Sequence, residues 1–188
     1  AGTIILLSTV VIWFTTFFGF TEEGFRMLGE DEIGLSILAQ IGSLIAWIFY
    51  TLGWGTWQAT VASIIGLVAK ENIVGTLGII YGATGSAYAG IAEAFTSVTG
   101  FSFLTFNLLC APCFAAIGAI KREMNSGKWT WIAIGYQCIF AYLTALVFTQ
   151  VGNLICGFGI NFFFLIVAVA VIALFIYLLF RRERKVAL

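Results

Sequence analysis

The residue best placed to do chemistry is Glu71, because it lies near the middle of an otherwise apolar run, residues 56 to 82. A carboxylate at the centre of a bilayer costs roughly 2.5 to 3.5 kcal/mol, so it must face a polar cavity, find a partner or take a proton. Lys70 cannot face it locally, since adjacent residues lie about 100° apart around a helix. Two interpretations stay open: a buried ion pair or helix cap, and a cation ligand whose partners lie on other helices. Asn72 extends this polar patch.

Two thiols in the segment NLLCAPC, Cys110 and Cys113, form a second candidate group. Their spacing would place them on one face of a helix. A redox dithiol is one interpretation, although such pairs usually occur in a βαβ context that this sequence lacks. Buried packing residues are another. We favour ligands for a borderline or soft cation, because thiolates select transition metals over magnesium and calcium.

Pro112 lies between these two thiols and could add an oxygen ligand. A proline inside a helix has no N–H, so the carbonyl of Leu108, four residues earlier, loses its usual donor. A free carbonyl beside thiols, with Glu71 nearby, is the combination that would suit a transition-metal ion.

Several kinds of chemistry are excluded by composition. The chain has no histidine, so it has no imidazole metal cluster, Ser/His/Asp triad or imidazole pH switch. It has no G-x-x-x-x-G-K-[ST] segment and thus no P-loop. Nine basic and nine acidic residues give zero net charge, which excludes a general basic surface for nucleic acid. The cysteines lie in or beside apolar runs, which favours free thiols over disulfides, and we interpret Cys138 and Cys156 as packing residues.

The elements that must position these groups are membrane helices. Of 188 residues, 61% are hydrophobic and only 10% charged, far below the roughly 25% charged residues of soluble domains. A bilayer core needs about 20 apolar residues of helix. The sequence therefore predicts an all-α, polytopic helical membrane protein with about six transmembrane segments, at residues 2 to 20, 34 to 50, 56 to 82, 101 to 120, 129 to 150 and 160 to 180.

Two of these segments are expected to be broken. The third carries Lys70 and Glu71 in its middle, and the fourth contains Pro112. We therefore predict breaks near Glu71 and Pro112, since broken helices present backbone groups to ions in transporters.

Orientation follows from the basic residues, because positively charged short loops stay in the cytoplasm. Seven of the nine lie within residues 121 to 128 and 181 to 185, which six alternating spans place on one side. The C-terminus is then cytoplasmic, and Trp54, Trp57, Trp129 and Trp131 are expected together at the inner boundary. Because the sequence opens at Ala1 inside an apolar run without a basic segment, we expect a fragment or one half of a larger protein.

Two long segments resemble a known family. GWGTWQATVASIIGLVAKENIVGTLGIIYG at 53 to 82 and FLTFNLLCAPCFAAIGAIKREMNSGKWTWIAIGYQCIFAYLTALVFTQVG at 103 to 152 closely resemble the second Gate region and C-terminal part of the ferrous iron transport protein B (FeoB) family. The opening AGTIILLSTVVIWF resembles the start of that Gate segment. The resemblance implies a Gate and C-terminal transmembrane region over 1 to 152, followed over 153 to 188 by a last transmembrane helix and a basic cytoplasmic tail.

Members of that family import Fe(II) across the bacterial inner membrane and combine a cytoplasmic GTPase domain with two related Gate halves. The resemblance implies that this chain is the membrane part of a GTP-regulated ferrous iron importer, providing one half of the path, and is not itself an enzyme. Fe(II) would be the transported substrate, with GTP and Mg²⁺ bound only by a domain outside this sequence. The implied partners are the other half of the transporter, its GTPase domain, small accessory Feo proteins, the lipid bilayer and further copies of the chain, but no nucleic acid.

The family's motifs also imply site residues. Its Ala-Lys-Glu motif matches Ala69, Lys70 and Glu71, and its Pro-Cys motif matches Pro112 and Cys113. Many members have a tyrosine where this chain has Cys110. The resemblance thus implies a metal site at mid-membrane between the two broken helices. Its expected ligands are Glu71, Cys113 and, as a third candidate, Cys110, with Lys70, Asn72, Pro112 and Leu108 along the ion path or its gate.

Two other functions remain open. The Gate pattern is shared with nucleoside-transport proteins, so a nucleoside or small-solute carrier is the first alternative. A structural membrane subunit is the second. The thiol of Cys113 favours iron, because a nucleoside site calls for amide and carboxylate hydrogen bonds.

Overall fold

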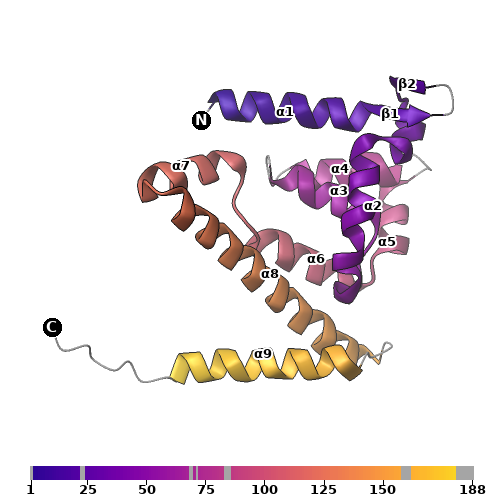
Figure 1. The fold of residues 1–188 in the computed structure, drawn as a ribbon. Coiled ribbons are helices and arrows are strands. Elements are labelled where there is room, and N and C mark those ends of the chain that lie inside the picture. Colours follow the sequence, from indigo (N-terminus) through magenta and orange to yellow (C-terminus); the bar gives the residue numbers. More distant parts are fainter. Residues whose placement is uncertain are drawn as a thin grey trace.

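The computed structural model describes residues 2–21, 24–67, 70, 72–82, 86–157 and 162–180. These residues are almost entirely helical, as the sequence predicts, with one small antiparallel hairpin among them (Figure 1). The elements are α1 (Gly2–Phe17), β1 (Phe18–Thr21), β2 (Gly24–Met27), η1 (Glu30–Leu35), α2 (Ile37–Phe49), η2 (Tyr50–Leu52), α3 (Trp57–Gly66), α4 (Asn72–Gly82), α5 (Ala87–Ala94), α6 (Ser97–Leu109), α7 (Phe114–Met124), α8 (Gly127–Cys156) and α9 (Phe162–Phe180).

The predicted count of six membrane spans is not confirmed. Within the described residues, two segments are long and apolar enough to cross a bilayer, Ser97–Met124 and α8, with 28 and 30 residues. A third arises only if Ile37–Leu52 and α3 are counted together, and these two helices meet at an angle of 99°. The stretch 56 to 82 is divided into α3 and α4, of 10 and 11 residues. At 1.5 Å per residue, neither helix alone spans the roughly 30 Å of a bilayer core.

The sharp bend after α2 depends on a glycine. Gly53 has a φ of 80°, in the left-handed region that favours glycine. A Cβ atom there would also lie 2.7 Å from Cγ2 of Thr99. Helix α3 then begins at an N-cap, because Thr56 Oγ1 accepts a hydrogen bond from the backbone N–H of Ala59.

Trp54 forms the centre of the core. It is 1% exposed, stacks on Phe49 at a centroid distance of 4.5 Å, and meets Phe103 edge-on at 5.0 Å. The expectation that Trp54 lies at the inner membrane boundary with Trp129 is therefore wrong. Trp129 is exposed near the start of α8, whereas Trp54 is enclosed because the bend carries the 53–56 turn into the molecule.

Buried hydroxyl groups join that turn to two helices. Ser102 on α6 donates to the carbonyl of Ala145 on α8, and Thr149 Oγ1 lies 2.8 Å from Ser102 Oγ and 3.2 Å from the carbonyl oxygen of Leu52. The turn thus lies beside Thr149, whereas Lys128 lies 21 residues earlier, about 30 Å away along α8. The turn and the basic segment 121 to 128 therefore lie near opposite ends of α8, and the structure does not confirm the alternation of six spans that would place both on one side.

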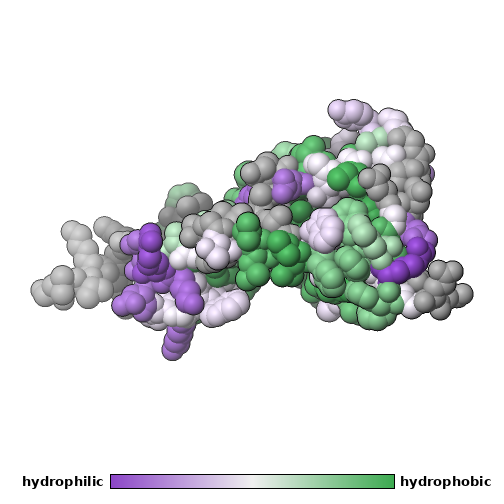
Figure 2. All heavy atoms as spheres, turned by 90° about the horizontal axis from the view of Figure 1, so that it is seen from above, coloured by the Kyte–Doolittle hydropathy of each residue, from purple (hydrophilic) through white to green (hydrophobic). Residues whose placement is uncertain are grey.

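The surface fits a membrane environment. Many large apolar side chains on α1, α8 and α9 are exposed, for example Leu6, Ile155 and Phe163. Figure 2 shows hydrophobic residues across the middle of one face and hydrophilic residues gathered toward its two ends. Exposed apolar surface of this extent is expected of a protein surrounded by lipid.

Candidate functional site

The first helix break lies between α3 and α4, where the sequence predicts one. Helix α3 ends at Gly66 and α4 begins at Asn72, which is exposed, with Lys70 in a turn between them. Glu71, the leading candidate ligand, lies outside the described residues. A Cβ on Gly66 would lie 2.6 Å from Cδ1 of Ile73, so the absence of a side chain there lets the two helices approach closely.

The second break lies between α6 and α7, at the predicted position of Pro112. Helix α6 ends at Leu109 and α7 begins at Phe114, with Cys113 at its N-cap position. Residues 110 to 113 are not helical, so Cys110 and Cys113 do not share a helix face as their spacing suggested. The break follows from the ring of Pro112, which supplies no N–H to the carbonyl of Leu108.

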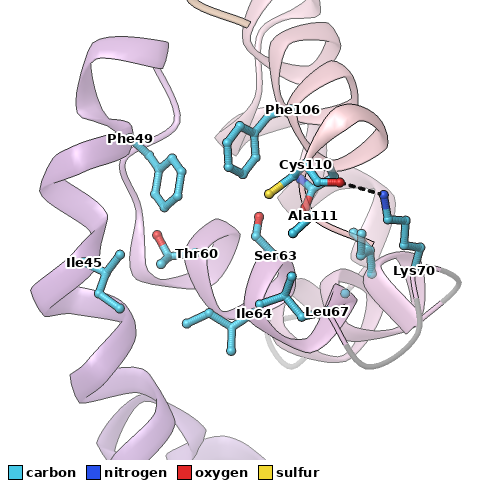
Figure 3. Close-up of a pocket in the computed structure, with 13 residues that line it drawn as sticks. Ile45, Phe49, Thr60, Ser63, Ile64, Leu67, Lys70, Phe106, Cys110 and Ala111 are labelled. Atoms are coloured by element: carbon cyan, nitrogen blue, oxygen red, sulfur yellow. Dashed lines mark hydrogen bonds between the residues drawn. The ribbon is translucent and has the colours of Figure 1, made fainter. Parts of the chain in front are cut away.

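Three hydrogen bonds join the breaks to each other. The backbone N–H of Phe114 donates to the carbonyl of Leu67 at 2.9 Å. The ammonium of Lys70 donates to the carbonyl oxygens of Leu108 at 3.0 Å and Cys110 at 3.3 Å. Figure 3 shows Lys70 reaching toward the chain at Cys110 and Ala111. The carbonyl that Pro112 leaves free is thus bound by a cation supplied by the first break.

This arrangement suits the electrostatics of a helix end. The last carbonyls of a helix carry partial negative charge, equivalent to about half an elementary charge, and a cation there is stabilising. Lys70 supplies that cation from outside the helix. Carbonyl oxygens arranged around an ammonium group can also accept a metal cation in its place.

A cavity of about 140 Å³ lies beside the joined breaks, between α2, α3 and the end of α6. Figure 3 shows its apolar wall, with Phe49 and Phe106, and the thiol of Cys110 pointing into the same space. At about 30 Å³ per water molecule, it has room for roughly four waters. Its polar lining consists of Thr60, Ser63, Lys70, Asn107 and Cys110.

Cys138 contacts one of the candidate site residues, and the sequence did not predict this contact. Its Sγ lies 3.7 Å from Sγ of Cys110, and all four cysteines are free thiols, as predicted. The two residues are 28 positions apart, and they meet because α6 and α8 run antiparallel. No local motif could have indicated this contact. Among the described residues, no cluster of three or more carboxylate, thiol or imidazole side chains forms a complete metal site.

A second, larger cavity of about 360 Å³ lies near the 50–56 turn and the end of α8. Its lining combines hydroxyl and amide side chains, including Thr51, Thr56, Gln150 and Asn153, without a carboxylate or thiol. The Oε1 atom of Gln150 is buried and has no hydrogen-bond partner among the described residues. This cavity suits neutral polar groups better than a transition metal.

Comparison with known proteins extends this description. A family model described as "Gate: Nucleoside recognition" matches residues 1–127. The "Fe(2+) transporter FeoB" of Methanocaldococcus jannaschii is 37% identical over 163 residues, which cover 82% of this chain and 23% of that protein. The protein of the same name from Staphylococcus aureus (strain COL) is 36% identical over 155 residues, or 82% of this chain and 22% of that protein.

The name of a third relative describes a fusion of two proteins. The "Fe(2+) transport protein A/Fe(2+) transporter FeoB fusion protein" of Porphyromonas gingivalis is 25% identical over 199 residues, covering 81% of this chain and 23% of that protein. The chain thus spans less than a quarter of the length of these relatives. No solved structure matches it significantly.

Proposed function

We propose that this chain, which belongs to the Gate family, provides one half of the path by which a ferrous iron importer moves Fe(II) across the bacterial inner membrane. The observation that carries the proposal is the pair of joined helix breaks, with carbonyl oxygens, thiols and a lysine ammonium beside a small cavity. The names and identities of the similar proteins support iron as the transported ion.

The chemistry of the breaks fits partial dehydration of Fe(II). Backbone carbonyls that are freed from helical hydrogen bonds can replace water around an ion, as they do in transporters with broken helices. Thiolates add selectivity for transition metals. We assign Glu71, Cys113 and Cys110 as the metal ligands, with the carboxylate of Glu71 supplying negative charge beside Lys70.

Lys70 acts in this proposal as the gate. Its ammonium occupies the carbonyl oxygens of Leu108 and Cys110. The ammonium and Fe(II) cannot share these oxygens, because a unit charge and a divalent ion about 4 Å apart repel by roughly 8 kcal/mol at an effective dielectric constant of 20. Fe(II) therefore enters only when Lys70 moves away. Asn72, at the start of α4, and Pro112, inside the second break, set the path along which Lys70 moves.

The rest of the transporter supplies regulation. We infer that GTP and Mg²⁺ bind to a GTPase domain outside this chain and bias the position of Lys70. The fusion relative supports an accessory Feo protein as a partner. The basic residues Lys121, Arg122 and Lys128 at the α7–α8 junction favour a cytoplasmic position for that junction, and we place the C-terminus of the 153–188 segment on the same side.

The test is iron uptake by cells carrying substituted protein. Glu71→Gln and Cys113→Ser should each abolish Fe(II) uptake, while membrane insertion and GTP hydrolysis by the intact transporter continue. Uptake at the level of the unsubstituted protein would overturn the assignment. Cys156→Ser is the matched control, because Cys156 is exposed at the end of α8 and away from the breaks.

The description of the family model makes a nucleoside or small-solute carrier the second candidate. The cavity at the breaks, about 140 Å³, is smaller than the roughly 300 to 1,000 Å³ typical of organic ligands. An organic solute would fit the second cavity, with its hydroxyl and amide lining. Competition separates the two functions: inhibition of uptake by Mn(II) or Co(II), but not by nucleosides, supports iron, and the reverse supports the carrier.

A further inference from the structure

We propose that Cys110 and Cys138 together form a two-thiolate site for a soft or borderline divalent metal ion. The site would bind the ion transiently along the transport path. That role rests on the proposed function, whereas the binding itself does not. Its new element is Cys138, which lies on α8, outside both helix breaks.

The separation of the sulfur atoms fits two ligands of one ion. Metal–sulfur bonds of about 2.3 Å at a tetrahedral angle place two sulfurs about 3.8 Å apart, and the thiols of Cys110 and Cys138 lie 3.7 Å apart. A linear two-coordinate ion would need about 4.6 Å from the same bond lengths. A disulfide would need about 2.05 Å. The observed distance between the two sulfur atoms therefore allows both to bind one ion at a bent angle, with little movement of either side chain.

The two helices hold this separation from both sides. Ser102 on α6 donates a hydrogen bond to the carbonyl of Ala145 on α8, about two helical turns away from the thiols. The backbone bond from Phe114 to Leu67 fixes the chain after Cys110. Cys110 itself lies outside the helix and lines the cavity, so an ion in the cavity can reach its sulfur.

The positive charge of Lys70 links the two-thiolate site to the proposed gate. Lys70 donates to the carbonyl of Cys110, so its ammonium lies close to one of the two ligands. Its positive charge repels an arriving divalent metal ion. When a divalent ion binds, each thiol gives its proton to water and the two thiolates neutralise the ion's charge. Binding is therefore expected when Lys70 withdraws.

Incomplete coordination suits a transported ion. Structural metal sites close around four protein ligands, whereas sites that exchange a ligand keep an open position. Two thiolates leave the other positions to water or to carbonyl oxygens. An ion in transit must bind well enough to enter and weakly enough to leave.

The test is Co(II) binding to the purified intact protein in lipid nanodiscs without oxygen. Co(II) bound to thiolate gives a charge-transfer absorption that oxygen-bound Co(II) lacks. We expect this absorption in the unsubstituted protein and in Cys156→Ser, and a clearly weaker absorption in Cys110→Ser and Cys138→Ser, because each of these variants removes one thiolate ligand. Unchanged absorption in Cys138→Ser would overturn the proposal.

Two further measurements are needed. The first distinguishes loss of a metal ligand from misfolding, and the second distinguishes failure of the thiolate site from failure of the transport proposal. Cys138→Ala and Cys156→Ala should remain equally monodisperse and helical. A weaker charge-transfer absorption in Cys138→Ala then reports the loss of a ligand. If Glu71→Gln leaves Fe(II) uptake intact while the Cys138 spectrum behaves as expected, the transport proposal fails and the thiolate site stands. If Glu71→Gln abolishes uptake but Cys138→Ser keeps the spectrum, the thiolate site fails and the transport proposal stands.

Discussion

The ammonium of Lys70 lies 3.0 Å from the carbonyl oxygen of Leu108 and donates a hydrogen bond to it. In an unbroken helix that carbonyl would accept from the backbone N–H four residues later, where this chain has Pro112. A side chain from one helix break therefore supplies the donor that the other break lacks. This hydrogen bond joins two segments that lie 38 residues apart in the sequence.

The first prediction concerns the charge of Lys70. Lys70→Met removes two hydrogen bonds to carbonyl oxygens and should lower the free energy of unfolding by about 1 kcal/mol, a modest value because the lysine is partly exposed. Lys70→Arg keeps the charge and should lose less. Lys128→Met, at an exposed position on α8, is the control. Thermal unfolding in detergent measures all three, and equal loss in the two methionine variants would contradict the role of the contact.

The second prediction concerns Pro112. Pro112→Ala restores a backbone N–H that can donate to Leu108, so α6 should extend and compete with Lys70 for that carbonyl. We expect slower amide hydrogen exchange over residues 110 to 114 and reduced Fe(II) uptake. Faster exchange over the same residues, or exchange equal to that of the unsubstituted protein, would show that the break does not depend on the proline.

The sequence predicts the positions of both breaks because their causes are local. A proline removes a donor at a known position, and Lys70 with Glu71 cannot remain in an uninterrupted apolar helix at low cost. The sequence could not predict that Cys110 meets Cys138, because that contact depends on the register of α6 against α8. It also misplaced Trp54, since the 99° bend at Gly53 decides whether this tryptophan faces lipid or the core. Hydrophobicity marks the membrane segments, but it does not report how they bend.

The third prediction tests the close packing at the first break. Gly66→Ala would place a Cβ 2.6 Å from Cδ1 and Cγ1 of the buried Ile73, so we expect a loss of about 1 to 3 kcal/mol in unfolding free energy. Gly75→Ala is the matched control, because among the described residues no atom outside its own helical turn lies within 4 Å of the added Cβ, and alanine stabilises a helix interior by up to about 1 kcal/mol. Ile73→Ala combined with Gly66→Ala should recover part of the loss. No recovery would indicate that the clash is not the cause.

The last prediction tests the buried hydroxyl network that holds the 53–56 turn against α6 and α8. Ser102 is fully buried, and its Oγ lies 3.4 Å from Nε1 of Trp54 and 2.8 Å from Oγ1 of Thr149. Ser102→Ala leaves the indole N–H of Trp54 buried without its partner, which should cost about 1 to 3 kcal/mol. Thr144→Val is the control, because the hydroxyl of Thr144 donates within its own helix turn, to the carbonyl of Phe140. Chemical unfolding followed by tryptophan fluorescence measures both variants. Because the bond from Ser102 to Ala145 also joins α6 to α8, Ser102→Ala should slightly weaken Co(II) binding at the thiols, and unchanged binding would show that other contacts hold the two sulfurs together.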